Sequence, residues 1–245
     1  MRMIHNFKIA LLAVCLSASA LASAEPIFYE ARYPVTNAMP VPAVLALHSS
    51  GGYASVTGKV GAFVDAGYAV YTPDFFKKHG ITTATRFDTW GIYRTDIEQE
   101  LSELVQLMKK DPKVDSKNIF AVGYSNGGYW AAFLAAKGFV NAGVAHYGVW
   151  SFPNNVNGYP ASYFSLTSHP MLALVGLNDQ TQKTQFVLPQ VERAQKLSPT
   201  VQLHTYQATH GWDCKVCNAE YVRNEEVTAD ALNRTLEFFR ANTKK

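Results

Sequence analysis

A serine stands at the centre of a Gly-Tyr-Ser-Asn-Gly pentapeptide at residues 123–127, which makes Ser125 the middle of a G-x-S-x-G motif. An apolar run at 119–123 precedes the motif and a helical pattern at 127–137 follows it. This strand–turn–helix context is the one that a nucleophile elbow requires. The small neighbours let strand and helix approach closely, so that the turn projects the hydroxyl outward. We therefore predict that Ser125 is a nucleophile in acyl transfer; the alternative is a glycine-rich packing turn.

A nucleophilic serine needs a base, and the base needs a carboxylate that orients it. In proteins with this elbow the chain order is Ser, then acid, then His. Asp179 lies in a loop after the apolar run 171–175, and His210 lies in a loop after the run 201–206. The predicted catalytic residues are therefore Ser125, Asp179 and His210.

Three other histidines fit this order less well. His204 lies inside a predicted strand, His169 precedes a strand at its wrong end, and His146 comes before the acid. We expect these three to be packed or surface histidines. Asp213 is too near His210 in sequence to approach it from the side opposite the serine, so we expect a solvated loop carboxylate.

The oxyanion that forms during acyl transfer needs hydrogen-bond donors. Asn126, directly after the predicted nucleophile, offers its backbone N–H. The second donor should come from the turn after an earlier apolar run, where residues 48–52 read His-Ser-Ser-Gly-Gly. We predict the backbone N–H of Ser50, with Ser49 as the alternative. His48 itself is expected to brace this turn by hydrogen bonds.

The elements that must position these residues alternate between strands and helices. Near-continuous apolar runs are typical of a parallel sheet covered on both faces. The predicted strands are 42–48, 68–71, 119–123, 142–147, 171–175 and 201–206, and the predicted helices are 96–110, 127–137 and 227–241. The sequence therefore predicts an α/β fold in which the loops after the strands form the site.

Two long segments interrupt the alternation. Residues 75–91 form a polar, Thr-rich connection, and residues 148–168 carry five aromatic residues. Loops of this length in a compact domain are often functional. We take Trp150, Tyr124 and Trp212 as possible substrate-pocket residues, and the loop 148–168 as a possible lid. The alternative is that its aromatic residues only cover the core.

The first residues are typical of a leader. Arg2 and Lys8 supply the positive charge, an apolar run follows, and Ala-Ser-Ala at 22–24 matches a cleavage site. The apolar stretch is short for a membrane span, and a retained anchor is the alternative. We predict a signal peptide at 1–24, no stable membrane insertion after its removal, and a single domain at 25–245. The protein would then be exported, to a periplasmic or extracellular location.

Composition and charge favour an ordinary globular enzyme. Hydrophobic residues make up 48% of the chain and charged residues 17%. The net charge of +3 falls to +1 without the leader, which carries two basic residues and no acidic one. A nearly neutral chain without a basic cluster gives no electrostatic case for nucleic acid. We expect a small-molecule ester or acyl substrate and no metal or cofactor; the oligomeric state is left open.

Cys214 and Cys217 remain once Cys15 leaves with the leader. In an exported protein such a pair is most simply a disulfide, here holding the segment after His210. Redox catalysis by this C-x-x-C would need a thioredoxin-like unit. Haem attachment would need a histidine where Asn218 stands, and a zinc site would need two more ligands.

The chain resembles the dienelactone hydrolase family of α/β-hydrolases over nearly all of the segment after the leader. The resemblance rests on HSSGG at 48–52, YAVYTPD at 68–74, GYSNGG at 123–128, GLND at 176–179, THGW at 209–212 and LEFFRAN at 236–242. It implies an eight-stranded, mostly parallel sheet, and it assigns nucleophile, acid and base to Ser125, Asp179 and His210. The name-giving enzymes use cysteine as nucleophile, so the serine here suits a general esterase at least as well as a lactone-opening enzyme.

The leading hypothesis is a serine hydrolase that cleaves a carboxylic ester or lactone through an acyl-enzyme. Ser125 would carry the acyl group, His210 would be the base, and Asp179 would orient it. A peptidase of the same fold is a sister possibility. Thiol–disulfide exchange and a binding protein that keeps the fold without catalysis are readings from other classes. Covalent labelling by a fluorophosphonate distinguishes the hydrolase from the binding protein, because it needs an activated serine, and replacing both cysteines tests thiol–disulfide exchange.

Overall fold

The computed structural model describes residues 27–152, 160–215 and 217–245. The predicted signal peptide at 1–24 lies outside the described residues, and so does part of the 148–168 segment. Among the helices that are described, none combines the length and the apolar character needed to cross a bilayer.

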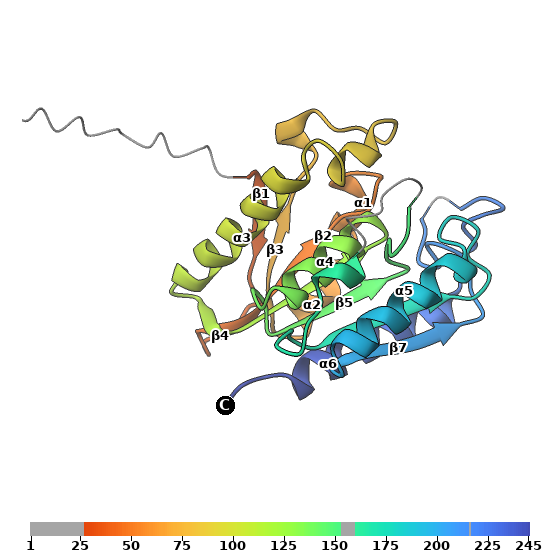
Figure 1. Cartoon of the computed structure of the whole chain (residues 1–245). Coiled ribbons are helices and arrows are strands. Elements are labelled where there is room, and N and C mark those ends of the chain that lie inside the picture. Colours follow the sequence, from red (N-terminus) through yellow and green to blue (C-terminus); the bar gives the residue numbers. More distant parts are fainter. Residues whose placement is uncertain (1–26, 153–159, 216) are drawn as a thin grey trace, which may run out of the picture.

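A sheet in the order β1-β3-β2-β4-β5-β6-β7 runs through the middle of the molecule (Figure 1). Strands β2 to β7 are parallel, and β1 pairs antiparallel with β3 at one edge. The strands are β1 (Tyr29–Arg32), β2 (Val41–Leu47), β3 (Ala69–Pro73), β4 (Val114–Tyr124), β5 (Ala142–His146), β6 (Met171–Gly176) and β7 (Val201–Tyr206). The six predicted strands and their parallel arrangement are confirmed.

The expected number of eight strands differs from the structure, since the described residues form seven. Between β1 and β2, Pro34 and Pro40 lack the N–H that a strand ladder needs. This part of the chain therefore contributes one antiparallel edge strand to the sheet.

Helices cover both faces of the sheet (Figure 1). They are α1 (Ala54–Thr57), α2 (Gly61–Asp65), α3 (Arg94–Lys110), α4 (Asn126–Ala136), α5 (Thr184–Leu197) and α6 (Glu225–Ala241), with short 3-10 helices η1 (Lys77–His79), η2 (Arg86–Thr89) and η3 (Pro160–Tyr163). One core cluster joins the sheet to α3, α4 and α5. A second cluster on the opposite face joins it to α1, α2 and α6. The predicted α/β class with helices on both faces is confirmed.

Strand alternation in β4 decides which face each side chain meets. Ile119 and Ala121 belong to the α4 face, whereas Phe120, Val122 and Tyr124 belong to the α6 face. Successive side chains of a strand point to opposite faces. The residue just before the predicted nucleophile therefore faces the core beneath α6.

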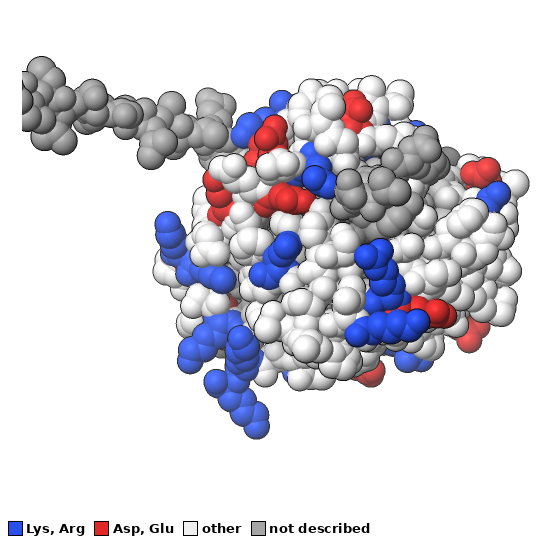
Figure 2. Space-filling view, viewed as in Figure 1, with Lys and Arg blue, Asp and Glu red and all other residues white. Residues whose placement is uncertain are grey.

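Acidic and basic side chains are interspersed over much of the surface seen in Figure 2, and basic ones gather at the lower left near the C-terminus. This mixture agrees with the small net charge. The central helix α4 is buried along its whole length. Its N-terminus, directly after the G-x-S-x-G serine, is therefore held rigidly at the end of β4.

Candidate active site

The loops after β4, β6 and β7 bring Ser125, Asp179 and His210 together at the C-terminal edge of the sheet. Nε2 of His210 lies 2.8 Å from Oγ of Ser125, and Nδ1 lies 2.6 Å from Oδ2 of Asp179. A carboxylate only accepts hydrogen bonds, so we assign the proton of Nδ1 to the Asp179 contact. All three residues are buried: Ser125 is 8% exposed, His210 4% and Asp179 3%. They form one buried, hydrogen-bonded chain.

The backbone of Ser125 is held in an unusual conformation, with φ of 52° and ψ of −109°. Positive φ is uncommon outside glycine and persists where surrounding contacts enforce it. Three main-chain hydrogen bonds do so here. The Ser125 N–H donates to the His146 carbonyl at 3.0 Å, and the Ser125 carbonyl accepts from Val149 and Gly128 at 3.0 and 2.9 Å.

Two glycines make this turn possible. A Cβ added to Gly123 would lie 1.9 Å from the carbonyl oxygen of Gly127, and one added to Gly127 would lie 2.2 Å from the carbonyl oxygen of Leu47. Both neighbours are backbone atoms that cannot move aside cheaply. The two glycines of the motif are therefore required by the close approach of strand, helix and neighbouring strand.

The Asp179 carboxylate is fixed by hydrogen bonds on both oxygens. Oδ1 accepts from the backbone N–H of Thr181 at 2.8 Å and of Gln182 at 2.6 Å, which leaves Oδ2 for His210. The carboxylate cannot rotate without breaking these contacts. His210 is therefore held in one orientation from the Nδ1 side.

The side chains of the two residues predicted to supply the oxyanion donors lie close together. The side-chain Nδ2 of Asn126 lies 3.5 Å from Oγ of Ser50 and donates to Oγ1 of Thr89 at 3.1 Å. Within the described residues, neither the Asn126 nor the Ser50 backbone N–H donates to a protein atom. The alternative donor, the N–H of Ser49, already donates to Oγ of Ser55 at 3.0 Å. The Ser50 and Asn126 N–H groups therefore remain the predicted pair of donors.

His48 is fully buried behind this turn. Nδ1 lies 2.8 Å from the carbonyl oxygen of Ser49, and the ring stacks on Phe75 with centroids 3.7 Å apart. Burial lowers the pKa of His48 to about 4, so the ring is neutral near pH 7. This agrees with the bracing contact that the sequence predicts.

The prediction for Asp213 is wrong. Its side chain is only 11% exposed; it accepts a hydrogen bond from the Tyr147 hydroxyl at 2.5 Å and pairs with Lys59. The loop after His210 folds back over the α1–α2 connection, which removes this carboxylate from solvent. The remaining expectation holds, because the carboxylate that contacts His210 is that of Asp179.

The aromatic residues predicted for the substrate pocket are all buried. Tyr124 and Trp212 belong to the core cluster on the α6 face, and Trp150 belongs to the cluster on the α4 face, stacked on Phe164. Strand alternation directs the Tyr124 side chain to the α6 face of the sheet. The turn at Gly211, whose φ is 57°, precedes Trp212, and the Trp212 side chain enters the same core. These three side chains pack the core and do not line the described cavity.

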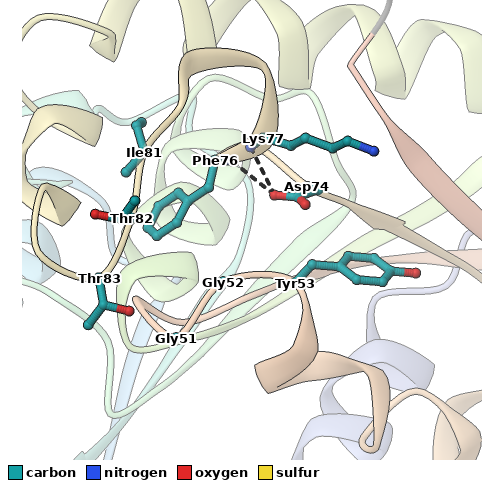
Figure 3. A pocket seen from close by; sticks show the side chains of 9 residues that line it. All are labelled: Gly51, Gly52, Tyr53, Asp74, Phe76, Lys77, Ile81, Thr82 and Thr83. Atoms are coloured by element: carbon teal, nitrogen blue, oxygen red, sulfur yellow. Dashed lines mark hydrogen bonds between the residues drawn. The ribbon is translucent and has the colours of Figure 1, made fainter.

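A cavity of about 410 Å³ adjoins the turn after β2 instead (Figure 3). Its lining residues come from that turn and from the segment after β3: Gly51, Gly52, Tyr53, Asp74, Phe76, Lys77, Ile81, Thr82 and Thr83. Figure 3 shows Phe76 reaching into the space between Thr82 and the Gly51–Gly52 turn. The Thr83 hydroxyl donates to the Ser50 carbonyl at 3.0 Å, which ties this wall to the predicted oxyanion donor.

Two polar side chains that connect the site loops are missed by the sequence reasoning. Oε1 of Gln182 accepts from the backbone N–H of Trp150 and Ser151 at 3.3 and 3.4 Å, joining the acid loop to the 148–152 segment. Thr89 reaches Asn126 from the 75–91 connection. Neither residue lies in a motif, and the polar Thr-rich composition of 75–91 is the only signal that points to the second.

Cys214 and Cys217 form the predicted disulfide, four residues after His210. The Cys214 N–H donates to the Gly211 carbonyl at 2.9 Å, and its carbonyl accepts from Arg223 at 2.9 Å. The bridge thus fastens the segment next to His210. Within the described ranges, His, Cys, Asp and Glu side chains do not gather in threes or more to hold a metal ion.

Comparisons with known proteins point to one family. The model of the dienelactone hydrolase family matches residues 31–243. No curated protein matches the chain significantly. A putative dienelactone hydrolase from Klebsiella pneumoniae superposes with a TM-score of 0.71 at 19% identity, over 86% of this chain and 92% of that one.

Two further solved structures are similar to the chain. A dienelactone hydrolase-like promiscuous phosphotriesterase from metagenomic libraries has a TM-score of 0.67 and 17% identity, covering 87% of this chain and 91% of that one. A propionate-bound esterase from Thermogutta terrifontis has a TM-score of 0.66 and 16% identity, covering 87% and 88%. At these identities the likeness shows a shared fold.

Proposed function

Because the chain belongs to the dienelactone hydrolase family, we propose that it is a serine hydrolase that cleaves a carboxylic ester or lactone. The observation that carries the proposal is the hydrogen-bonded chain from Ser125 through His210 to Asp179. Nucleophile, base and orienting acid are recognised by such geometry.

In the first half of the reaction, Oγ of Ser125 attacks the carbonyl carbon while its proton passes to Nε2 of His210. The negative charge that develops on the carbonyl oxygen is met by the backbone N–H groups of Asn126 and Ser50. One such donor commonly contributes 10²–10³ in rate. His210 then gives its proton to the departing alcohol, and the acyl group stays on the serine.

In the second half, water attacks the acyl-enzyme. His210 takes a proton from the water and returns it to Oγ of Ser125 as the acid product leaves. Asp179 holds Nδ1 protonated throughout and stabilises the imidazolium. For a lactone, the departing alcohol and the acid product are two ends of one molecule.

The cavity beside Ser50 is proposed to hold part of the substrate. Its volume of about 410 Å³ lies in the range of small-molecule sites. Phe76 and Ile81 supply apolar walls, and Thr82 and Thr83 supply hydroxyl groups. This lining favours a small acyl or alcohol group with both apolar and polar edges.

We further propose that residues 1–24 are a signal peptide and that residues 25–245 form one exported domain. The Cys214–Cys217 disulfide supports export, because disulfides persist in oxidising compartments outside the cytosol.

The test is hydrolysis of p-nitrophenyl acetate, butyrate and octanoate by residues 25–245, beside Ser125→Ala. Loss of the nucleophile should lower kcat by about 10⁶ and abolish labelling by a fluorophosphonate. Ser168→Ala is the matched control, because it also removes the hydroxyl of a buried serine. Ser168 is 5% exposed, and its hydroxyl donates to the Ala136 carbonyl at 2.8 Å and not to His210, so the variant should keep the wild-type kcat. Equal activity of wild type and Ser125→Ala would show that Ser125 is not the nucleophile.

A further inference from the structure

Tyr147 shares an uncommon backbone state with Ser125. These two are the non-glycine residues with positive φ among those described, and Tyr147 has φ of 40°. Such strained positions cluster at functional sites. The two are also neighbours: the Ser125 N–H donates to the carbonyl of His146, which directly precedes Tyr147, and the Tyr147 N–H donates to Leu174 at 2.9 Å. The fold therefore enforces a specific direction on the Tyr147 side chain.

That direction places the tyrosine ring against the ring of His210. The two ring centroids are 5.0 Å apart with an interplanar angle of 64°. Trp212 packs on Tyr147 edge to face at 4.7 Å. Edge-to-face contacts of this kind have a preferred geometry. The imidazole is thus restrained through its ring as well as through its two nitrogen atoms.

The hydroxyl of Tyr147 is anchored in turn. It donates to Oδ1 of Asp213 at 2.5 Å, and Oδ2 of Asp213 pairs with Nζ of Lys59. Burial, together with the Asp213 charge, raises the pKa of Tyr147 well above its ordinary value, so the hydroxyl remains a donor. The Lys59 and Asp213 side chains are 20% and 11% exposed. Breaking a largely buried ion pair is costly, because it leaves the other charge without a partner.

This set joins two loops of the site. Asp213 is three residues after His210, and Lys59 follows α1, which begins just after the turn that carries Ser50. Nζ of Lys59 also lies 4.7 Å from the ring centroid of Tyr124, the residue directly before Ser125. The segments of the base, the nucleophile and the oxyanion turn therefore meet at one tyrosine, one carboxylate and one ammonium group.

We propose that Tyr147, held by Asp213 and Lys59, is a positioning residue that keeps the His210 imidazole in register with the Ser125 hydroxyl. It acts through His210 and does not touch the reacting atoms. The inference rests on the proposed function, since it concerns the same reaction. Misplacing a catalytic group by about 1 Å can cost about 10² in rate.

The molecule contains a matched control. Tyr206 donates to Oδ2 of Asp230 at 2.8 Å, and Nε of Arg234 pairs with the same oxygen at 2.6 Å. This is again a tyrosine, a carboxylate and a cation, but it joins β7 to the surface of α6. Tyr206→Phe removes the same hydroxyl contact as Tyr147→Phe without changing the neighbours of His210.

The experiment compares Tyr147→Phe, Lys59→Met, Lys59→Arg and Tyr206→Phe in the full mature chain with p-nitrophenyl butyrate, alongside melting temperatures. Tyr147→Phe and Lys59→Met should lower kcat between about 10-fold and 100-fold with little change in KM, because the lost interaction matters in the transition state. Lys59→Arg should restore most of kcat, and Tyr206→Phe should keep it. The rate of fluorophosphonate labelling should fall in parallel with kcat.

Wild-type kcat in folded Tyr147→Phe and Lys59→Met would overturn the positioning role while leaving the hydrolase proposal intact. An equal loss in Tyr206→Phe would also overturn it, because the effect would then follow general stability. A wild-type protein that neither turns over esters nor labels would remove the proposed function, and the positioning role with it.

Discussion

His210 and His146 are both buried histidines near the C-terminal edge of the sheet, and they differ in their partners. His210 contacts a carboxylate at 2.6 Å and a hydroxyl at 2.8 Å. The His146 ring is hydrogen-bonded to the Thr235 hydroxyl at 2.9 Å and packs against the rings of Tyr124 and Trp212, and burial lowers its pKa to about 4. Burial disfavours the protonated imidazole, and the charge of Asp213, which is not hydrogen-bonded to the ring, offsets only part of this effect. Burial alone therefore does not make a base; the proposed base needs an acid beside it.

The two histidines also differ in how the chain holds them. His146 is the last residue of β5, with β4 and β6 paired on either side. Its carbonyl supports Ser125, while its side chain points toward α6. His210 lies in a loop after β7 and depends on side-chain contacts for its position. A strand end thus supplies rigid backbone to the site, whereas a loop supplies the group that must reach into it.

Asp179→Asn gives His210 a neutral partner like that of His146, and among the variants that test the difference between the two histidines it should produce the largest effect. The neutral amide cannot fix the imidazole in the tautomer protonated at Nδ1, and it cannot stabilise the imidazolium that forms. We therefore expect kcat to fall by about 10⁴ while the fold stays intact. The measurement is kcat with p-nitrophenyl butyrate, together with the melting temperature. Asp230→Asn, on the surface of α6, is the control. A loss below tenfold for Asp179→Asn would remove Asp179 from the proposed mechanism.

Local motifs near strand ends were sufficient to predict three side chains that the structure brings together. Ser125, Asp179 and His210 each lie within a few residues after an apolar run, and parallel strands end at one edge of the sheet. The position of Tyr124 next to Ser125 in the sequence does not decide which face of the sheet its side chain meets. The alternation of Phe120, Val122 and Tyr124 carried that information.

The positioning set could not be predicted in the same way. Lys59, Tyr147 and Asp213 lie in three separate segments, and no motif or spacing joins them. Their contacts depend on how the loop after His210 folds over the α1–α2 connection, which only tertiary packing determines. The cavity likewise depends on tertiary packing, because its walls come from two separate segments, the turn after β2 and residues 74–83.

His146→Gln should affect stability rather than catalysis. The folded-state pKa of about 4 lies below the unfolded value near 6.5, so His146 contributes stability that is present above pH 6.5 and is lost as the pH falls toward 4. Between pH 7 and pH 5 this loss is about 2 kcal/mol for one such histidine. Urea unfolding at both pH values should show a shallower pH dependence in His146→Gln than in wild type. The part due to His48 should remain, because burial lowers its pKa to about 4 as well.

At pH 7, His146→Gln should keep kcat within about threefold of wild type, because its side chain does not enter the proposed proton transfer. A pH dependence of stability unchanged by the substitution would show that His146 is not the buried neutral group described here. A loss of kcat as large as that of Asp179→Asn, in a folded variant, would break the distinction between the two histidines.

An effect no larger than that of His146→Gln is expected from the disulfide, which fastens the segment after His210. Cys214→Ser with Cys217→Ser opens a very short loop, and the chain-entropy estimate for such a loop is about 2 kcal/mol. His210 keeps its contacts with Asp179, Ser125 and Tyr147, so kcat should fall by less than about threefold. Urea unfolding of the double variant measures the loss of stability, and its kcat measures the effect on catalysis. Wild-type protein with the disulfide reduced should behave like the double variant. If the folded double variant lost all activity, the cysteines would have a chemical role, and thiol–disulfide exchange would return as the leading explanation of this segment.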